Sequence, residues 1–394
     1  MMRLFINALA ANAGGGLTYI RNVIPHLAEV PDVFSIVALS PDLRREFCSV
    51  ANNVEFLELN ATPGRRFWLE QLELPRMIQR YGANILLSAG NFALKRAGVP
   101  QILLSRNSIY FSTDFFRDLR KRRDYRMWIE TQMRGVIAKR SISWADATVA
   151  PSEAFAGELR RSRNGARIVA IPHGFDRQAF CGDSSPLAPQ VEAKLRDTDG
   201  SLKLLLVSHY NYYRNFETLI RALPILHARL SGRSIKLLLT CKLAPGANPG
   251  AYKPARAASL IRDLNVSDMV VELGAIPYRQ LHQLYRRADV YVTAAYTETF
   301  AHPLVEAMAS NLPVVASDLD VHREICGESA VYFPRFSAEA LAECMARLVQ
   351  SPETMRSIAA EGEKRSHQFS WKTHVEKIVD LARELIGPKA ATAQ

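Results

Sequence analysis

The sequence predicts an α/β fold built from parallel sheets with helices on both faces. Short apolar runs rich in β-branched residues alternate with helical patterns along most of the 394 residues, which is typical of parallel sheets. A polar stretch with little periodicity, about 182–200, divides this alternation into two series. The length suits two domains of ordinary size. We therefore expect two domains with a boundary near 175–200.

The strands of each series are predicted from short runs that are almost wholly apolar. In the first series a helix at about 17–28 follows the first strand, as in a βαβ unit. The expected strands of the first series are 4–9, 34–39, 85–88, 101–104, 147–150 and 167–171. Those of the second series are 203–207, 235–240, 269–273, 290–293 and 314–316, and the last expected helix is about 373–386.

The composition is that of an ordinary globular protein, with 48% apolar and 23% charged residues. The five cysteines form no CxxC pair, which argues against a zinc site or a disulfide framework and is compatible with a reducing compartment. No run reaches the roughly 20 apolar residues that span a bilayer. The apolar start imitates a signal peptide, but Asn7 interrupts it, and we expect a first strand leading into Gly14–Gly16.

A dense basic stretch at 117–140 contributes much of the net charge of +11. It holds nine Lys or Arg and three acidic residues, and the pattern is helical. Phe111, Phe115 and Phe116 precede it, and Tyr125 and Trp128 lie within it. Two interpretations stay open: an anionic membrane surface as partner, or a solvated helix with its aromatic residues packed inward. We expect no nucleic-acid binding, because no recognised module accompanies the charge.

The most informative stretch is 298–306, which places two glutamates eight positions apart. Glu298 follows the expected strand at 290–293, and Glu306 falls about one turn into a helix that Pro303 suits as a first residue. Free N–H groups at a helix N-terminus favour an anionic or hydroxyl-rich ligand, and flanking carboxylates accept hydrogen bonds from sugar hydroxyls. On spacing alone, a solvated loop Glu and a helix Glu are the favoured explanation, because two glutamates eight positions apart are common.

The residues around this pair resemble the Glu-x7-Glu motif of the family 4 retaining glycosyltransferases. The resemblance runs from Thr297 through Ala309 and continues into Leu312–Ser317, which looks like the next strand of that family. Further matches occur in order along the chain and cover nearly all of it. They are Gly14–Gly16, Pro151–Glu153, Ile171–Asp176, Arg214–Ile220, Glu324, Gly327 and Phe369–Trp371.

The resemblance implies the GT-B fold, two Rossmann-like domains facing across a cleft. It implies an N-terminal acceptor domain at 1–177, completed by the C-terminal helix within 373–394, and a nucleotide-sugar donor domain at 200–372. The expected function is that of a metal-independent, hexosyltransferase-type retaining glycosyltransferase. It would move a sugar from a nucleotide sugar to a glycan or lipid-linked acceptor, in polysaccharide or glycolipid assembly.

Two other functions remain open on the same fold. One is a catalytically weak protein that binds a nucleotide sugar or a partner enzyme. The other is a nucleotide-sugar epimerase or hydrolase, which would need a further acid–base pair that the sequence does not reveal. We expect a cytoplasmic protein, peripheral on the inner face of the membrane if the basic stretch binds lipid.

The resemblance assigns the phosphate clamp to His209 and Arg214, where the family usually has an Arg and a Lys. Arg214 supplies the cation and binds phosphate through two N–H groups. His209 is a departure, since an unperturbed histidine is mostly neutral near pH 7. It either becomes protonated beside the diphosphate or donates a neutral hydrogen bond. We predict Glu298, Arg214 and His209 as the catalytic residues.

The resemblance also assigns donor-binding residues around Glu298, which would hold the sugar hydroxyls. Glu306 would hold the ribose, and Gly15 and Gly16 would let backbone approach a phosphate. The backbone N–H groups of three residues after Glu298 would help, namely those of Thr299, Phe300 and Ala301. Arg106 and Asn107 stand near a position where family members often carry a His, and we expect them on the acceptor side.

No metal or cofactor is expected. Gly14–Gly16 is not a GxGxxG fingerprint, so a nicotinamide cofactor is not inferred. Asp-x-Asp spacings occur at 197–199 and 318–320, of which the second follows an expected strand. The resembling family places basic side chains on the diphosphate instead of a metal ion. His173 is expected to be a structural loop residue.

Overall fold

The computed structural model describes residues 1–11, 14–47, 52–60 and 63–387. The chain forms two compact units. Unit 1 comprises 1–111, 129–174 and 369–394, and unit 2 comprises 112–128 and 175–368. These bounds differ from the expected 1–177 and 200–372, chiefly because 112–128 belongs to unit 2 and because 175–199 is part of that unit as well.

Unit 1 is built on a parallel seven-stranded sheet in the order β3-β2-β1-β4-β5-β6-β7. The strand order reverses at β1, which pairs with both β2 and β4. In such sheets ligands bind beyond the carboxyl ends of the strands. The strands are β1 (Met2–Asn7), β2 (Val33–Leu39), β3 (Val54–Glu58), β4 (Ile85–Ser88), β5 (Gln101–Leu104), β6 (Ala147–Ala150) and β7 (Ile168–Ala170).

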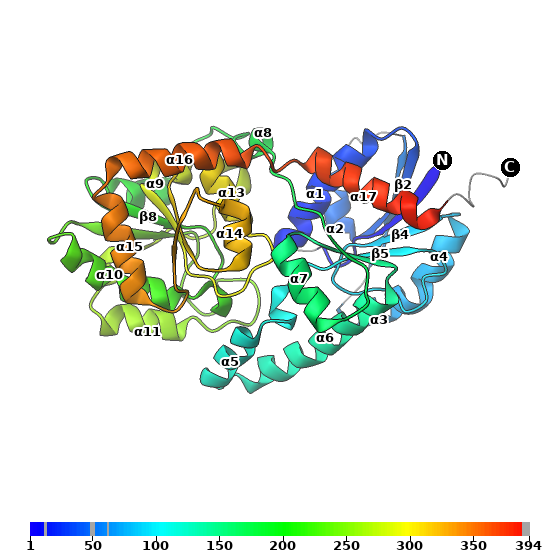
Figure 1. Ribbon diagram of the computed structural model, residues 1–394, viewed down its shortest axis with the longest axis horizontal. Helices are drawn as coiled ribbons and strands as arrows, with labels where there is room; N and C mark the ends of the chain where they lie inside the picture. Colours follow the sequence, from blue (N-terminus) through cyan, green and yellow to red (C-terminus); the bar gives the residue numbers. More distant parts are fainter. Residues whose placement is uncertain (12–13, 48–51, 61–62, 388–394) are drawn as a thin grey trace. The chain divides into compact units, whose positions relative to one another are not determined.

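Helices cover the sheet of unit 1, and the last helix of the chain returns to it (Figure 1). They are α1 (Gly14–Ala28), α2 (Pro41–Arg44), α3 (Pro63–Trp68), α4 (Leu74–Arg80), α7 (Glu153–Ser162) and α17 (Trp371–Ile386). A π-helical turn, η1 (Leu69–Glu73), joins α3 to α4, and η2 (Ser108–Tyr110) is a 3-10 turn. Helix α6 (Tyr125–Trp144) begins in unit 2 and continues in unit 1.

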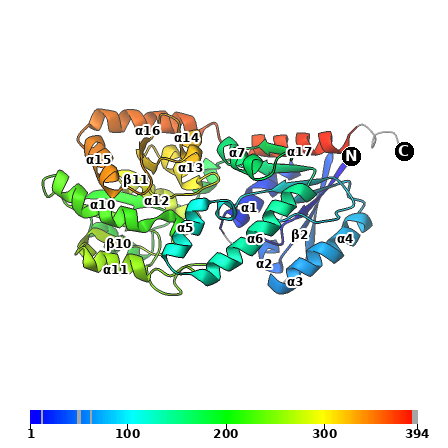
Figure 2. The ribbon, with the colours of Figure 1, turned by 60° about the horizontal axis from the view of Figure 1, so that its bottom comes forward.

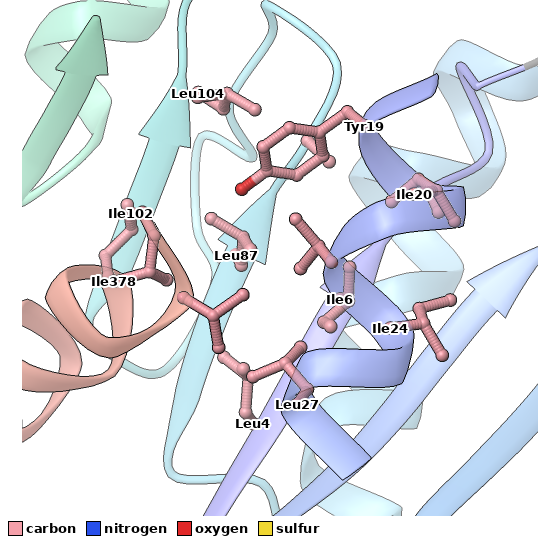
Figure 3. Close-up of a cluster of buried hydrophobic side chains, with 14 of the residues drawn as sticks. Leu4, Ile6, Tyr19, Ile20, Ile24, Leu27, Leu87, Ile102, Leu104 and Ile378 are labelled. Carbon is pink, nitrogen blue, oxygen red and sulfur yellow. The ribbon is translucent and has the colours of Figure 1, made fainter. Parts of the chain in front are cut away.

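One face of this sheet packs against α1 and α17 (Figure 3). Leu4, Leu87 and Ile102 of the strands meet Ile24 of α1 and Ile378 of α17, and all five are buried. Burial of such side chains contributes about 1.5–3 kcal/mol each. The first βαβ unit and the last helix therefore share one core.

Unit 2 contains a parallel six-stranded sheet in the order β10-β9-β8-β11-β12-β13. Its strands are β8 (Leu202–Leu206), β9 (Ile235–Leu239), β10 (Val270–Glu272), β11 (Val290–Thr293), β12 (Val314–Ser317) and β13 (Val331–Phe333). The strand order reverses at β8, which pairs with β9 and β11. The carboxyl ends of β8 and β11 therefore lie side by side.

Most helices of unit 2 pack in pairs around this sheet. Helix α10 lies against α15, and α13 lies against α16 (Figures 1 and 2). The helices are α5 (Thr113–Lys121), α8 (Arg177–Phe180), α9 (Pro189–Arg196), α10 (Phe216–Arg229), α11 (Ala255–Asp263), α12 (Leu281–Arg287), α13 (His302–Ala309), α14 (Asp320–Cys326), α15 (Ala338–Val349) and α16 (Pro352–Ser366). The 3-10 turns are η3 (Tyr212–Arg214), η4 (Ser267–Met269) and η5 (Tyr278–Gln280).

The basic stretch forms two helices separated by a break. Helix α5 ends at Lys121 and α6 starts at Tyr125, with Arg123 in the left-handed region at φ 55°. Phe115 is fully buried, and Phe116 and Trp128 are half-buried with their rings edge to face. Inward packing therefore describes these aromatic residues, whereas Tyr125 is exposed.

Two further expectations concern membrane spans and cysteines. Within the described part of the chain, no helix combines the length and the apolar character needed to cross a bilayer.

Cys181, Cys241, Cys326 and Cys344 are free thiols, and Cys48 lies outside the described residues. Burial raises the pKa of the Cys241 and Cys326 thiols to about 12. Both thiols are therefore protonated and unreactive near neutral pH.

Candidate functional site

Unit 2 brings Arg214 and Glu298 into direct contact. Arg214 ends η3, after β8, and Glu298 follows β11, the strand that pairs with β8. The Arg214 guanidinium donates a hydrogen bond to Glu298 Oε1, and the two side chains are only 17% and 10% exposed. Two of the predicted catalytic residues thus form a nearly buried ion pair at the carboxyl edge of the sheet.

The environment of Arg214 keeps its charge and leaves it a spare donor. Burial opposes the charge, but the carboxylate of Glu298 outweighs it, so that the pKa of Arg214 is raised. The ring of Tyr213 lies 5.3 Å from the guanidinium carbon. Arg214 Nε is buried and has no hydrogen-bond partner among the described residues. The guanidinium can therefore bind an additional acceptor, such as a phosphate oxygen.

Left-handed backbone at two non-glycine residues flanks this pair. Asn215, directly after Arg214, has φ 54°, and Ala301, the N-cap of α13, has φ 61°. Asn215 is held in place because its amide donates to the Arg335 carbonyl at 2.7 Å and accepts from the Thr218 hydroxyl at 3.0 Å. A left-handed alanine costs free energy, and such strain concentrates where a site requires a particular backbone.

Glu306 is the second carboxylate of the motif and is deeply buried. It lies on α13, is 5% exposed, and accepts a hydrogen bond of 2.7 Å from the Tyr285 hydroxyl of α12. Burial raises its pKa to about 7, and the Tyr285 hydrogen bond opposes this rise. The Glu306 carboxyl therefore changes charge near neutral pH. Thr299, Phe300 and Ala301, which start the turn into α13, are also buried.

His209 lies in the loop between β8 and η3, on the same edge as Arg214. Its backbone carbonyl accepts from the Ser208 hydroxyl at 2.7 Å and from the Asn211 amide at 3.2 Å. Burial, and next the positive charge of Arg214, lower the pKa of the ring. The ring is therefore neutral at pH 7 in its protein environment, and the state of His209 beside a diphosphate stays a prediction.

The predicted residues of the first domain lie together in unit 1. Gly14–Gly16 open α1, and a Cβ on Gly15 would meet nothing within 4 Å. Arg106 donates to the Gly15 carbonyl at 2.7 Å and to the Ala89 carbonyl, and burial lowers its pKa to about 10. Asn107 caps η2. Arg106 thus supports the glycine turn, and its acceptor-side role stays a prediction.

His173 and the Asp-x-Asp pairs have structural partners. His173 is buried in unit 1 and stacks on Trp371 at 5.4 Å. Asp318 accepts from Arg323 at 2.6 Å, and this contact lowers the pKa of Asp318. Among the described residues, no three His, Cys, Asp or Glu side chains gather in a way that could hold a metal ion.

The sequence argument missed two residues that support the site. Tyr285, the donor to Glu306, stands 21 positions before it, and no local spacing links them. His322 is buried, with Nδ1 at 2.9 Å from the Ser317 carbonyl. Burial lowers its pKa, and the charges of Glu298 and Arg214 also act on it. The only signal for His322 was its place just after the strand at 314–317.

Comparisons with known proteins identify the family of the chain. Residues 13–179 match the family described as Glycosyltransferase Family 4, and residues 189–365 match Glycosyl transferases group 1. The chain belongs to the family 4, group 1 glycosyltransferases. This glycosyltransferase also shares the α/β GT-B fold predicted from its motifs, as its two parallel sheets and structural neighbours show.

Its curated relatives are distant. A D-inositol 3-phosphate glycosyltransferase of Kineococcus radiotolerans is 25% identical over 259 residues, which are 63% of this chain and 59% of the relative. An MMP alpha-(1->4)-mannosyltransferase of Mycolicibacterium hassiacum is 29% identical over 163 residues, 40% of this chain and 38% of the relative. The chain thus matches less than two thirds of the length of these relatives.

Solved structures resemble the whole chain. Sucrose-phosphate synthase from Thermosynechococcus elongatus has a TM-score of 0.75 at 20% identity, with all of both chains covered. Anabaena HepE, in complex with UDP and glucose, has a TM-score of 0.68 at 17% identity, covering 97% of this chain and 99% of that one. At these identities the likeness shows the fold alone.

Glu306 gives the protein a pH dependence with a definite sign. Its folded-state pKa of about 7 lies above the ordinary 4.5. The stability it contributes is therefore fully present below that ordinary value and is lost as the pH rises through about 7. We expect Glu306→Gln to reduce the loss of unfolding free energy between roughly pH 6 and pH 8.

Urea denaturation of both proteins at the two pH values measures this difference. Glu353→Gln, a substitution of an exposed glutamate on α16, is the matched control and should follow the wild type. Equal pH dependence of the wild type and Glu306→Gln would show that Glu306 does not titrate near neutrality.

Proposed function

We propose that this glycosyltransferase moves a hexosyl group from a nucleotide sugar to an acceptor hydroxyl, with retention at the anomeric carbon and without metal or cofactor. The observation that carries the proposal is the Arg214–Glu298 pair at the carboxyl edge of unit 2. It combines a cation with a spare N–H and a carboxylate. The cation stabilises a diphosphate leaving group, and the carboxylate accepts hydrogen bonds from sugar hydroxyls.

The proposed reaction breaks the bond between the anomeric carbon and the β-phosphate oxygen. Negative charge then develops on the departing phosphate, and Arg214 stabilises it more in the transition state than in the ground state. His209 donates a neutral hydrogen bond. The acceptor oxygen attacks from the same face and its proton passes to the departing phosphate, so the configuration is retained. Glu298 orients the sugar by accepting from its hydroxyls.

The donor and the acceptor are proposed from the site and the relatives together. HepE is described with UDP and glucose, and two relatives are named for transfer to an inositol phosphate and for mannosyl transfer. Glu306, ionised above about pH 7, would accept from the ribose hydroxyls of a nucleotide. A glycan or lipid-linked acceptor of polysaccharide or glycolipid assembly would carry the accepting hydroxyl.

Helix α6 supports a cytoplasmic protein that lies peripherally on an anionic membrane. Ile129, Met133 and Val136 are 52%, 64% and 48% exposed and follow the spacing of one helical face. Lys139 and Arg140 are exposed further along α6. A basic helix with an exposed apolar stripe inserts shallowly into anionic bilayers.

Vesicle co-sedimentation tests this surface. Met133→Ser should weaken binding to vesicles containing phosphatidylglycerol several-fold, because it removes buried apolar area at the bilayer interface. Thr354→Ser, an exposed substitution on α16, should not change binding. Equal binding by Met133→Ser and wild type would remove the membrane from the proposal.

A second candidate function is nucleotide-sugar binding without turnover. The neutral His209 favours it, because the phosphate clamp then contains one cation. Glu298, paired with Arg214, must also exchange that partner when a sugar arrives. Both features reduce transition-state stabilisation relative to a clamp with two free cations. Donor binding without any transfer product would assign the protein to this function.

Glu298→Gln tests the proposed transfer. The amide keeps the size of the side chain but removes the charge that pairs with Arg214 and accepts from the sugar. We expect transfer from the preferred UDP, GDP or ADP sugar to fall by about 10²-fold. The circular dichroism spectrum should remain that of the wild type. Glu353→Gln is again the control, and an unchanged transfer rate in Glu298→Gln would contradict the site.

His209→Arg tests the phosphate clamp. A second permanent cation replaces a neutral ring, so affinity for the preferred nucleoside diphosphate should rise by about tenfold at low salt, and the gain should shrink as salt is added. Titration calorimetry measures both effects. His209→Gln, which keeps a neutral hydrogen-bond donor, should bind like the wild type. Lower affinity in His209→Arg would place the ring away from the diphosphate.

A further inference from the structure

Unit 2 contains a charged pocket of about 300 Å³ outside the Arg214–Glu298 pair. Helix α5, the first turns of α10 and α11, and the loops after β11 and β13 line it. Five of its side chains are basic, namely Arg117, Lys121, Arg122, Arg221 and Arg256. This excess of cations predicts that a ligand of the pocket is an anion.

The floor of the charged pocket is a buried ionic network. Arg122 donates to Asp118 and to Glu217, each at 2.8 Å, and is only 9% exposed. Asp118 also accepts from the Tyr296 hydroxyl at 2.8 Å. Burial opposes the charge of Arg122, but Glu217 and Asp118 outweigh it and raise its pKa. The two carboxylates of the floor thus share one cation, Arg122, and the floor keeps one negative charge.

The remaining carboxylate of the pocket is also paired. Asp114 accepts from Arg117 at 2.6 Å and from Arg335 at 2.6 Å. Arg335 is thereby joined to α5, and its carbonyl also holds Asn215. Every acidic side chain that lines the charged pocket therefore has a basic partner within unit 2. Three carboxylates are matched by three arginines, Arg117, Arg122 and Arg335, so the other cations of the pocket are in excess.

Three cations remain at the rim of the charged pocket. Lys121, Arg221 and Arg256 are exposed. Within the described chain, the side chains of Lys121 and Arg221 make no ion pair or hydrogen bond. Arg256 lies near enough to Glu217 for its charge to help lower the pKa of that carboxyl. Like charges around one cavity repel, and a bound anion relieves this repulsion.

The charged pocket shares its walls with the loops of the proposed donor site. Asn215 follows Arg214 directly, and Tyr296 stands two residues before Glu298. Helix α5 packs against η3, the turn that ends in Arg214. The Tyr296 N–H donates to the Tyr213 carbonyl at 3.0 Å, which links the two loops. A ligand in the pocket would therefore lie beside Asn215 and Tyr296, which are close in sequence to Arg214 and Glu298.

We propose that the charged pocket binds the phosphate group of a small phosphate ester, as a second anion site distinct from the donor site. Its volume is at the lower end for ligand pockets and suits a phosphate with a few attached carbons. Arg221 and Arg256 offer planar N–H pairs that match phosphate oxygens, and Lys121 adds a point charge. The ester is either a free metabolite or a lipid headgroup. The inference does not depend on the proposed transfer reaction.

Titration calorimetry with glycerol 3-phosphate tests the charged pocket. The full chain should bind the ester, and the double variant Lys121→Ser/Arg221→Ser should bind it at least tenfold more weakly. The matched control Arg229→Ser/Arg356→Ser removes two exposed arginines elsewhere in unit 2 and should bind like the wild type. All four substituted side chains are exposed, so none of the substitutions removes a contact of the core.

Two further arms place the ligand and identify its source. Arg214→Ala should retain glycerol 3-phosphate binding, because Arg214 does not line the charged pocket. The second arm uses vesicles of phosphatidylcholine with phosphatidylglycerol. Binding by the wild type that is lost in the Lys121→Ser/Arg221→Ser variant would identify a lipid headgroup. Binding of the soluble ester with the same loss identifies a free metabolite. Two results would overturn the proposal: no binding of either ligand to the wild type, or undiminished binding by the double variant.

Discussion

The nearly buried ion pair between Arg214 and Glu298 is the interaction on which the site of unit 2 depends. Removing two charges from water is costly, and a pair in this position is stable only if its geometry is well supported. The support comes from the sheet, because the paired strands β8 and β11 end side by side. It also comes from Asn215 and Ala301, whose left-handed backbone turns the two loops. A ligand that enters must replace part of this pairing.

Burial shifts the pKa values of Glu306 and His209 in opposite directions. Burial raises the pKa of the carboxyl and lowers that of the imidazole, so both groups favour their neutral forms. Near pH 7 the site thus holds one firm ion pair and two groups whose charge depends on their surroundings. A bound diphosphate would therefore receive a hydrogen bond from the neutral His209 ring and its compensating charge from Arg214.

Much of the fold follows from local patterns in the sequence, and the remainder does not, for physical reasons. Short, largely apolar runs identified β4, β5, β6 and β11 residue for residue, since a strand buried on both faces is mostly apolar. The short strands β3 and β13 were not among the expected strands, and a run of three residues such as β13 carries little periodicity. The expected polar linker at 182–200 contains α9, whose Val191 and Leu195 are buried.

Contacts between distant residues account for what the sequence did not reveal about the site. The motif placed Glu298, Glu306 and Arg214, but the partner of Glu306 is Tyr285, which no spacing rule links to it. Phe115 and Leu119 fall within the first domain expected at 1–177, yet both are buried in unit 2. An apolar helix face does not specify which core receives it. The charged pocket is a consequence of that docking.

A double-mutant cycle on Arg214→Met and Glu298→Gln, read out as kcat/KM for the preferred nucleotide sugar, tests most directly whether the pair works as one unit. If it does, the two effects are strongly non-additive, and the double variant is about as slow as the worse single variant, with a coupling of about 1 kcal/mol or more. Effects that simply add would show that the two side chains act independently, and the pair would then be a structural contact beside the site.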